Sequence, residues 1–91
     1  MKAKKYYLKG LVQGVFFRKY TQAKARELGL SGWVRNRSDN TVEVLAQGSA
    51  EKLEELRQWL WQGSPASEVG SVTEEDQAPF EATEFTIERT V

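Results

Sequence analysis

The chain has 91 residues, 40% of them apolar, which is enough for one globular core and too short for two. Cysteine and histidine are both absent, which excludes disulfides, thiolate metal sites, cysteine nucleophiles and histidine acid–base catalysis. We expect one domain over residues 1–91, in which any side-chain metal site would have to rely on carboxylates.

The formal net charge is +0, but the charges are unevenly distributed along the chain. Residues 1–48 contain ten Lys and Arg against three acids, or +7, and residues 49–91 contain three against ten, or −7. Two interpretations are open: oppositely charged surfaces that help to hold the halves together, or a basic first half that favours an anionic ligand. No apolar run reaches the length of a membrane span, and MKAKKYYLKG lacks the apolar stretch of a signal peptide, which predicts a soluble, cytoplasmic protein.

The first two predicted elements are a strand and a helix. Residues 4–12 alternate as a strand with one packed face, formed by Tyr6, Leu8 and Val12. Apolar and small residues then recur at helical spacing, at Phe17, Thr21, Ala25 and Leu28. Gly29 follows where a C-terminal cap belongs.

A β-hairpin and a second helix come next. Residues 31–37 and 41–48 have strand-like patterns, and Asp39 and Asn40 suit the positive dihedrals of a two-residue turn between them. Ser49 can cap a helix that Gly63 and Pro65 end. Its apolar face is formed by Leu53, Leu56 and Leu60, and we expect Trp59 and Trp61 to extend it.

The C-terminal part predicts a weak strand at residues 68–72 and a stronger one at residues 83–90. In the stronger one Phe85 and Ile87 face inward, while Glu84, Thr86 and Glu88 face outward. Residues 74–79, EEDQAP, are interpreted as an acidic turn. The order predicts an α+β, ferredoxin-like β-α-β-β-α-β sandwich, with an antiparallel sheet of four to five strands and two helices on one face.

The loop QGVFFR, residues 13–18, joins the first strand to the first helix. The unpaired N–H groups and positive dipole of a helix N-terminus favour a phosphate or carboxylate. Gly14 would let the backbone approach such a ligand, and the Arg18 guanidinium has two donors for phosphate oxygens. From these residues alone the alternative stays open that Gly14 turns the chain and Arg18 is a surface residue.

Longer motifs add to this picture. Residues 11–48 contain VQGVFFRKYT and GWVRN, which resemble the VQGV-x-FR-x-x-T and GWV-x-N patterns of the acylphosphatase family, at the family's spacing. LEELRQWLWQGSPASEV and EFTIER are similar to the family's second helix with its turn and to its closing strand, which extends the resemblance over nearly the whole chain. One departure is Asn40, where the family commonly has glycine; asparagine tolerates the same positive dihedral.

The resemblance implies a metal-free and cofactor-free hydrolase of acyl phosphates that acts as a monomer. It implies that Arg18 binds the substrate phosphate and that Asn36 positions the attacking water. The remaining phosphate contacts would come from backbone amides of Gln13, Gly14, Val15, Phe16 and Phe17. Inorganic phosphate or sulfate would then compete with the substrate. The leaving group is a carboxylate whose conjugate acid has a pKa of roughly 4, so no general acid is required.

Two other classes of protein share this predicted fold or loop. An RNA-binding module has the same element order, and YYLKGL resembles its first aromatic motif, but TVEVLAQG has no aromatic residue for base stacking. We therefore expect no nucleic-acid partner and no membrane partner. A regulatory domain that binds an anion without hydrolysing a substrate would use the same loop, and only a turnover assay separates it from the enzyme.

Overall fold

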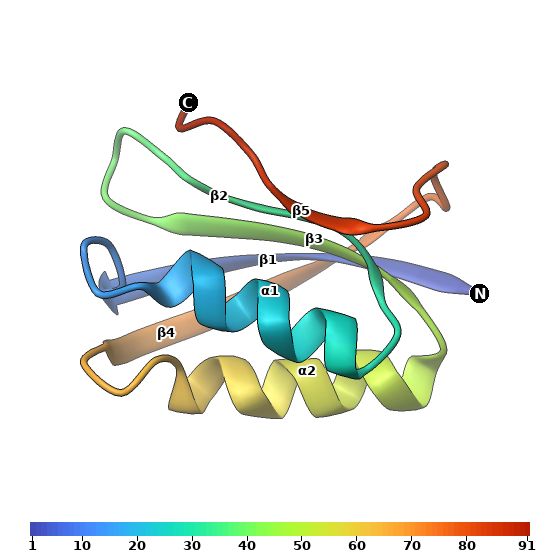
Figure 1. The fold of residues 1–91 in the computed structure, drawn as a ribbon, viewed down its shortest axis with the longest axis horizontal. Helices are drawn as coiled ribbons and strands as arrows, with labels where there is room; N and C mark the ends of the chain where they lie inside the picture. Colours follow the sequence, from blue (N-terminus) through green and yellow to red (C-terminus); the bar gives the residue numbers. More distant parts are fainter.

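The computed structural model describes residues 1–91 and confirms the predicted ferredoxin-like order of elements. Both helices lie on the same face of one sheet (Figure 1). The elements are β1 (Lys2–Leu11), α1 (Phe17–Glu27), β2 (Ser31–Asn36), β3 (Val42–Gly48), α2 (Ala50–Gln62), β4 (Glu68–Gln77) and β5 (Phe85–Ile87). Neither helix is long and apolar enough to cross a membrane.

The sheet has the strand order β4-β1-β3-β2-β5 and is mixed, because β5 pairs with β2 in parallel while all other neighbours are antiparallel. The register explains the parallel edge. Strand β4 ends at Gln77, in the same row of the sheet as Ser31, where β2 begins. The chain therefore crosses the end of the sheet and enters the far edge running in the same direction as β2. Gln47 holds this crossing, since its carboxamide both donates to Phe80 O and accepts from Phe80 N at 2.8 Å.

The predicted acidic turn over residues 74–79 is wrong for its first four residues, because β4 continues through Gln77. Glu75 and Asp76 pair with Lys5 and Lys4 across the β1–β4 ladder. The Lys4 ammonium lies 2.7 Å from the Asp76 carboxylate. Opposite charges on neighbouring strands stabilise the pairing, so a run that looks like a solvated turn in the sequence is a strand edge in the fold.

The hairpin turn also differs from the predicted two-residue form. Three residues, 38–40, lie between Arg37 and Thr41, whose backbones are joined by a hydrogen bond of 2.9 Å. Only Asn40 has a positive φ, 71°, as in hairpin loops that end with one left-handed residue. Asp39 instead accepts hydrogen bonds from the backbone and hydroxyl of Thr41, at 3.1 and 2.5 Å.

The core lies between the sheet and the helices, on the faces that the apolar periodicity predicts. Its buried members include Tyr6, Leu8, Phe17, Ala25, Val34, Val42, Val44, Leu53, Leu56, Leu60 and Phe85. Ile87 and Trp59 pack against it and are half-buried. The expectation for Trp61 is wrong: its side chain points out of the apolar face of α2 and is 46% exposed.

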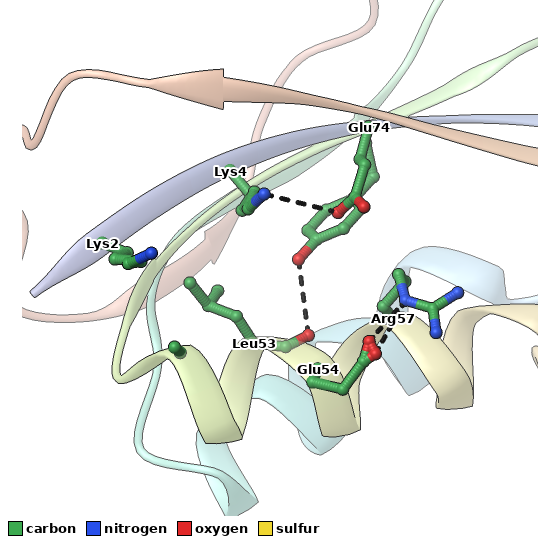
Figure 2. Close-up of a pocket in the computed structure, with 8 residues that line it drawn as sticks. Lys2, Lys4, Leu53, Glu54, Arg57 and Glu74 are labelled. Atoms are coloured by element: carbon green, nitrogen blue, oxygen red, sulfur yellow. Dashed lines mark hydrogen bonds and ion pairs between the residues drawn. The ribbon is translucent and has the colours of Figure 1, made fainter.

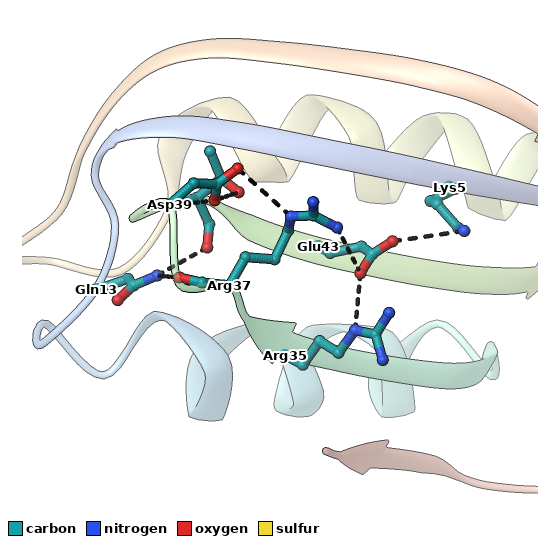
Figure 3. Close-up of polar contacts among 7 residues, drawn as sticks. Lys5, Gln13, Arg35, Arg37, Asp39 and Glu43 are labelled. Atoms are coloured by element: carbon teal, nitrogen blue, oxygen red, sulfur yellow. Dashed lines mark hydrogen bonds and ion pairs between the residues drawn. The ribbon is translucent and has the colours of Figure 1, made fainter. Parts of the chain in front are cut away.

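The sheet face opposite the helices contains one buried carboxylate, Glu43, which is 1% exposed (Figure 3). Its oxygens lie 2.7 Å from Arg35 Nε, 3.4 Å from Lys5 Nζ and 3.6 Å from Arg37 Nη1. Burial opposes ionisation of this group, but the Arg35 hydrogen bond and the neighbouring cations outweigh it and lower the pKa of Glu43. The interaction joins β1, β2 and β3 across the open face of the sheet.

Candidate active site

The loop between β1 and α1 is shaped by two residues in the left-handed region. Gly14 has φ 74° and Phe16, the residue before α1, has φ 60°. A Cβ at Gly14 would meet no atom within 4 Å, so the position favours glycine for its dihedral and not for lack of space. Phe16 adopts the same region at a cost of about 1 kcal/mol or more, and its side chain is 73% exposed.

This backbone leaves a row of unpaired donors. The N–H groups of residues 13–19 make no hydrogen bond to any acceptor of the protein. Phe16 offers no side-chain cap, and the first turn of α1 contains no acidic residue that could occupy the donors. Free N–H groups and a positive helix end are an arrangement that favours an anion.

Arg18, in the first turn of α1, and Asn36, at the end of β2, line one cavity of about 380 Å³ together with this loop. Gly14, Phe16 and Phe17 contribute to the same cavity, with Lys19 and Ile87 at its wall. The Arg18 side chain is half-buried and forms no ion pair or hydrogen bond with any residue of the chain. No carboxylate lines the cavity, so its field is positive.

Asn36 has an unusual side chain for a strand residue. Its Oδ1 atom is buried and has no hydrogen-bond partner in the protein. Its backbone is fixed, because Asn36 O accepts from Val91 N at 3.1 Å and Asn36 pairs with Val42 in the β2–β3 ladder. A buried acceptor without a partner is destabilising by about 1–3 kcal/mol, so this oxygen is suited to accept a hydrogen bond from a molecule in the cavity.

The predicted site residues lie together at one end of the fold, and the prediction for Gln13 and Val15 concerns their backbone amides only. Gln13 and Val15 do not line the cavity. The Gln13 side chain turns to the β2–β3 hairpin, and Val15 packs partly against the core. Both belong to the loop that encloses the site, and the Val15 carbonyl accepts a hydrogen bond of 2.7 Å from Ser64 Oγ.

Ser64 is a residue that the sequence reasoning treated only as part of the turn after α2. It is 2% exposed and ties that turn to the loop beneath the cavity. The signal available in the sequence was its place between Gly63 and Pro65, which predicts a fixed turn but not its partner.

A second cavity, of about 200 Å³, lies between β1, β4 and α2 and contains cations as well (Figure 2). Two of its three cations have partners: Lys4 lies 2.7 Å from Asp76, and Arg57 donates to Glu54 at 2.6 and 2.9 Å, whereas Lys2 forms no ion pair. The Tyr6 hydroxyl at its base donates to Leu53 O at 3.4 Å, and burial raises the pKa of Tyr6. The carboxylates of Glu54 and Glu74 line this cavity and offset part of its positive charge, whereas no carboxylate lines the first cavity.

The fold and the cavity together define a small ferredoxin-like protein with unpaired backbone donors and an unpaired cation at the N-terminus of its first helix. Comparisons with known proteins identify the family to which this fold belongs. The family model described as acylphosphatase matches residues 4–87. An acylphosphatase of Xanthomonas campestris pv. campestris (strain 8004) is 56% identical over 73 residues, which cover 80% of this chain and 83% of that protein.

Two further relatives extend the similarity. Acylphosphatase-1 of Gallus gallus is 49% identical over 88 residues, covering 92% of this chain and 89% of that protein. The crystal structure of acylphosphatase from Bacillus subtilis is similar with a TM-score of 0.92 at 35% identity, and the match covers 96% of this chain and 98% of that one. The chain belongs to the acylphosphatase family.

Proposed function

We propose that this acylphosphatase hydrolyses the carboxyl–phosphate bond of acyl phosphates by in-line attack of a water that Asn36 positions on a phosphate that Arg18 and the loop amides hold. The observation that carries the proposal is the pairing of two unsatisfied groups on one cavity. The Arg18 guanidinium has no partner in the chain, and neither has the buried Asn36 Oδ1.

The phosphate would bind at the end of α1. Its oxygens would accept hydrogen bonds from the free N–H groups of the loop and from the planar fork of Arg18, which matches two oxygens at once. Lys19 adds a second positive charge at the wall of the cavity. These groups are held in place before the substrate arrives, so they can stabilise charge on the phosphoryl group in the transition state without reorganisation.

The water would be oriented by Asn36 Oδ1, which accepts a hydrogen bond from it, so that a lone pair of the water oxygen is directed at phosphorus. As the new P–O bond forms, the bond to the carboxylate oxygen breaks and the carboxylate leaves with the electron pair. A carboxamide is not a base, so the proton of the water passes to a phosphate oxygen of the substrate itself. The carboxylate is a good leaving group and needs no proton, which is consistent with a chain that has no histidine or cysteine.

No cluster of three or more Asp or Glu side chains is arranged to hold a metal ion. We propose that turnover is independent of divalent cations, because the Arg18 guanidinium and the N-terminus of α1 supply the positive charge that stabilises the phosphate. Hydrolysis of benzoyl phosphate in the presence of a chelator tests the function. Absence of turnover with intact phosphate binding would leave an anion-binding domain instead.

The alternative of an RNA-binding module is disfavoured by the open face of the sheet. Guanidinium groups of the chain already lie over two aromatic rings on this face. Arg35 lies 4.4 Å from the Trp33 ring centroid, and Arg37 lies 5.5 Å from that of Tyr7. Rings covered in this way are poor platforms for base stacking.

A further inference from the structure

The Gln13 side chain makes a contact that no other residue of the loop makes. Its Nε2 donates to two backbone carbonyls of the β2–β3 hairpin, Arg37 O and Thr41 O, each at 2.8 Å (Figure 3). Both hydrogens of the amide are therefore used. The two carbonyls are those that flank the hairpin turn, and each also accepts a backbone hydrogen bond within the turn, from Asn40 N and Arg37 N.

The position of this contact in the chain matters. Gln13 directly precedes Gly14, which lines the cavity, and Arg37 directly follows Asn36, which also lines it. The contact spans 24 and 28 residues of sequence. No other hydrogen bond joins the loop to the hairpin. On the side of α2, the loop is held by the hydrogen bond from Ser64 Oγ to the Val15 carbonyl.

We propose that the Gln13 side chain is a positioning residue, which fixes the distance between the phosphate-binding loop and Asn36. This inference rests on the proposed function. The loop and Asn36 belong to different elements, so neither element alone sets their separation. In-line attack requires the reacting atoms at about 3–3.5 Å, and a displacement of about 1 Å can lower a rate by roughly a hundredfold.

The hydrogen-bond chemistry explains why a glutamine suits this place. Two carbonyl oxygens need two donors, and a carboxamide supplies both from one nitrogen. Gln13→Met keeps the length and removes both donors. Gln13→Glu keeps the shape but directs a carboxylate at two carbonyls, which disfavours its charged form. When protonated, that carboxyl regains one donor.

The test is steady-state hydrolysis of benzoyl phosphate together with inorganic phosphate binding by calorimetry. For Gln13→Met we expect kcat to fall by about tenfold to a hundredfold while the Kd for phosphate stays within about threefold, because the binding groups remain in the loop. The matched control is Gln22→Met. Gln22 is also half-buried and donates to a backbone carbonyl, Phe85 O at 3.1 Å, but it does not line the cavity. Its kcat should stay within about twofold.

The second variant gives a readout that a purely structural role would not produce. The kcat of Gln13→Glu, divided by that of the wild type at each pH, should be low at neutral pH and rise as the carboxyl is protonated below about pH 5–6. This ratio decides the question if Gln13→Met does not fold.

The outcomes separate the two proposals. If Gln13→Met has the kcat of Gln22→Met, or if the Gln13→Glu ratio is independent of pH, the positioning role is wrong. If phosphate affinity falls as much as kcat, Gln13 acts on binding and the inference is also wrong. If the wild type does not hydrolyse benzoyl phosphate, or Asn36→Ala keeps full turnover, the proposed function fails instead.

Discussion

The Asn36→Ala substitution tests the catalytic arrangement most directly, because it separates turnover from both binding and stability. The carboxamide that it removes contains a buried oxygen with no partner in the folded protein. Such an oxygen destabilises the fold by about 1–3 kcal/mol, and its removal offsets the packing that a half-buried side chain loses. We therefore expect the free energy of unfolding to change by no more than about 1 kcal/mol.

Turnover should respond very differently. A preorganised group that interacts mainly with the transition state contributes about 3–4 kcal/mol, so kcat should fall by roughly a hundredfold to a thousandfold. Phosphate should bind almost normally, because Arg18 and the loop amides are untouched. The expected signature is a large loss of kcat at unchanged phosphate affinity and unchanged stability.

The assay combines benzoyl phosphate kinetics, phosphate calorimetry and urea unfolding of the same preparation. Asn36→Asp serves as the comparison, since it keeps an acceptor of the same size but adds a negative charge beside the phosphate, and its phosphate affinity should fall. Near-normal turnover of Asn36→Ala, or loss of phosphate binding in proportion to turnover, would refute the role of Asn36 as the group that orients the water.

Three further predictions follow from the same structure. Arg18→Lys keeps one charge but loses the planar fork, so phosphate affinity should fall by roughly tenfold and kcat by more; equal affinity in calorimetry would contradict the bidentate contact. Dialysis against a chelator should leave kcat unchanged, and a loss that magnesium restores would contradict the metal-free mechanism. Glu43→Gln removes the buried carboxylate between three cations and should lower the free energy of unfolding by about 2 kcal/mol at pH 7. Burial opposes ionisation of Glu43, but Arg35 and its neighbours lower the pKa of this carboxyl in the folded protein. The stabilisation that the carboxylate contributes is therefore fully present above the unfolded-state pKa of about 4.3 and is lost as the pH falls through the lowered folded-state pKa. The stability difference between wild type and variant should therefore shrink in acid; a difference that does not depend on pH would show that packing, not charge, carries it.

Periodicity was sufficient for the parts of the fold that a buried face determines. The positions of Leu53, Leu56 and Leu60 repeat at helical spacing because α2 packs one stripe on the sheet, and the alternation of Val42, Val44 and Ala46 reflects one packed face of β3. Where partners from another strand decide the conformation, the local pattern failed. Residues 74–76 are acidic and exposed, and only pairing with β1 makes them a strand.

The candidate site shows the same contrast between features that a local pattern predicts and features that depend on distant partners. The shared cavity of Arg18 and Asn36 could be predicted because each lies in a motif at a fixed place relative to an element, while their catalytic roles stay predictions. Gln13 and Ser64 could not be assigned side-chain partners, because those partners are backbone carbonyls that lie far along the chain. A backbone carbonyl has no signature in the sequence, so contacts of this kind become visible only once the fold is known.

The structure shows where the charges of the two halves lie, and it confirms the first interpretation at Lys4 while the second stays a prediction. Lys4 joins the halves through Asp76 and Glu74, as the first interpretation requires. Each of the three acids in residues 1–48 pairs with a nearby cation away from the cavity: Glu27 with Lys24, Asp39 with Arg37, and Glu43 with Arg35, Lys5 and Arg37. No carboxylate is left to compete for Arg18, whose guanidinium stays unpaired at the positive end of α1. The number of basic residues in the first half is thus less important than where their partners lie. The acids pair with other cations, and the Arg18 guanidinium keeps its donors free for an anion.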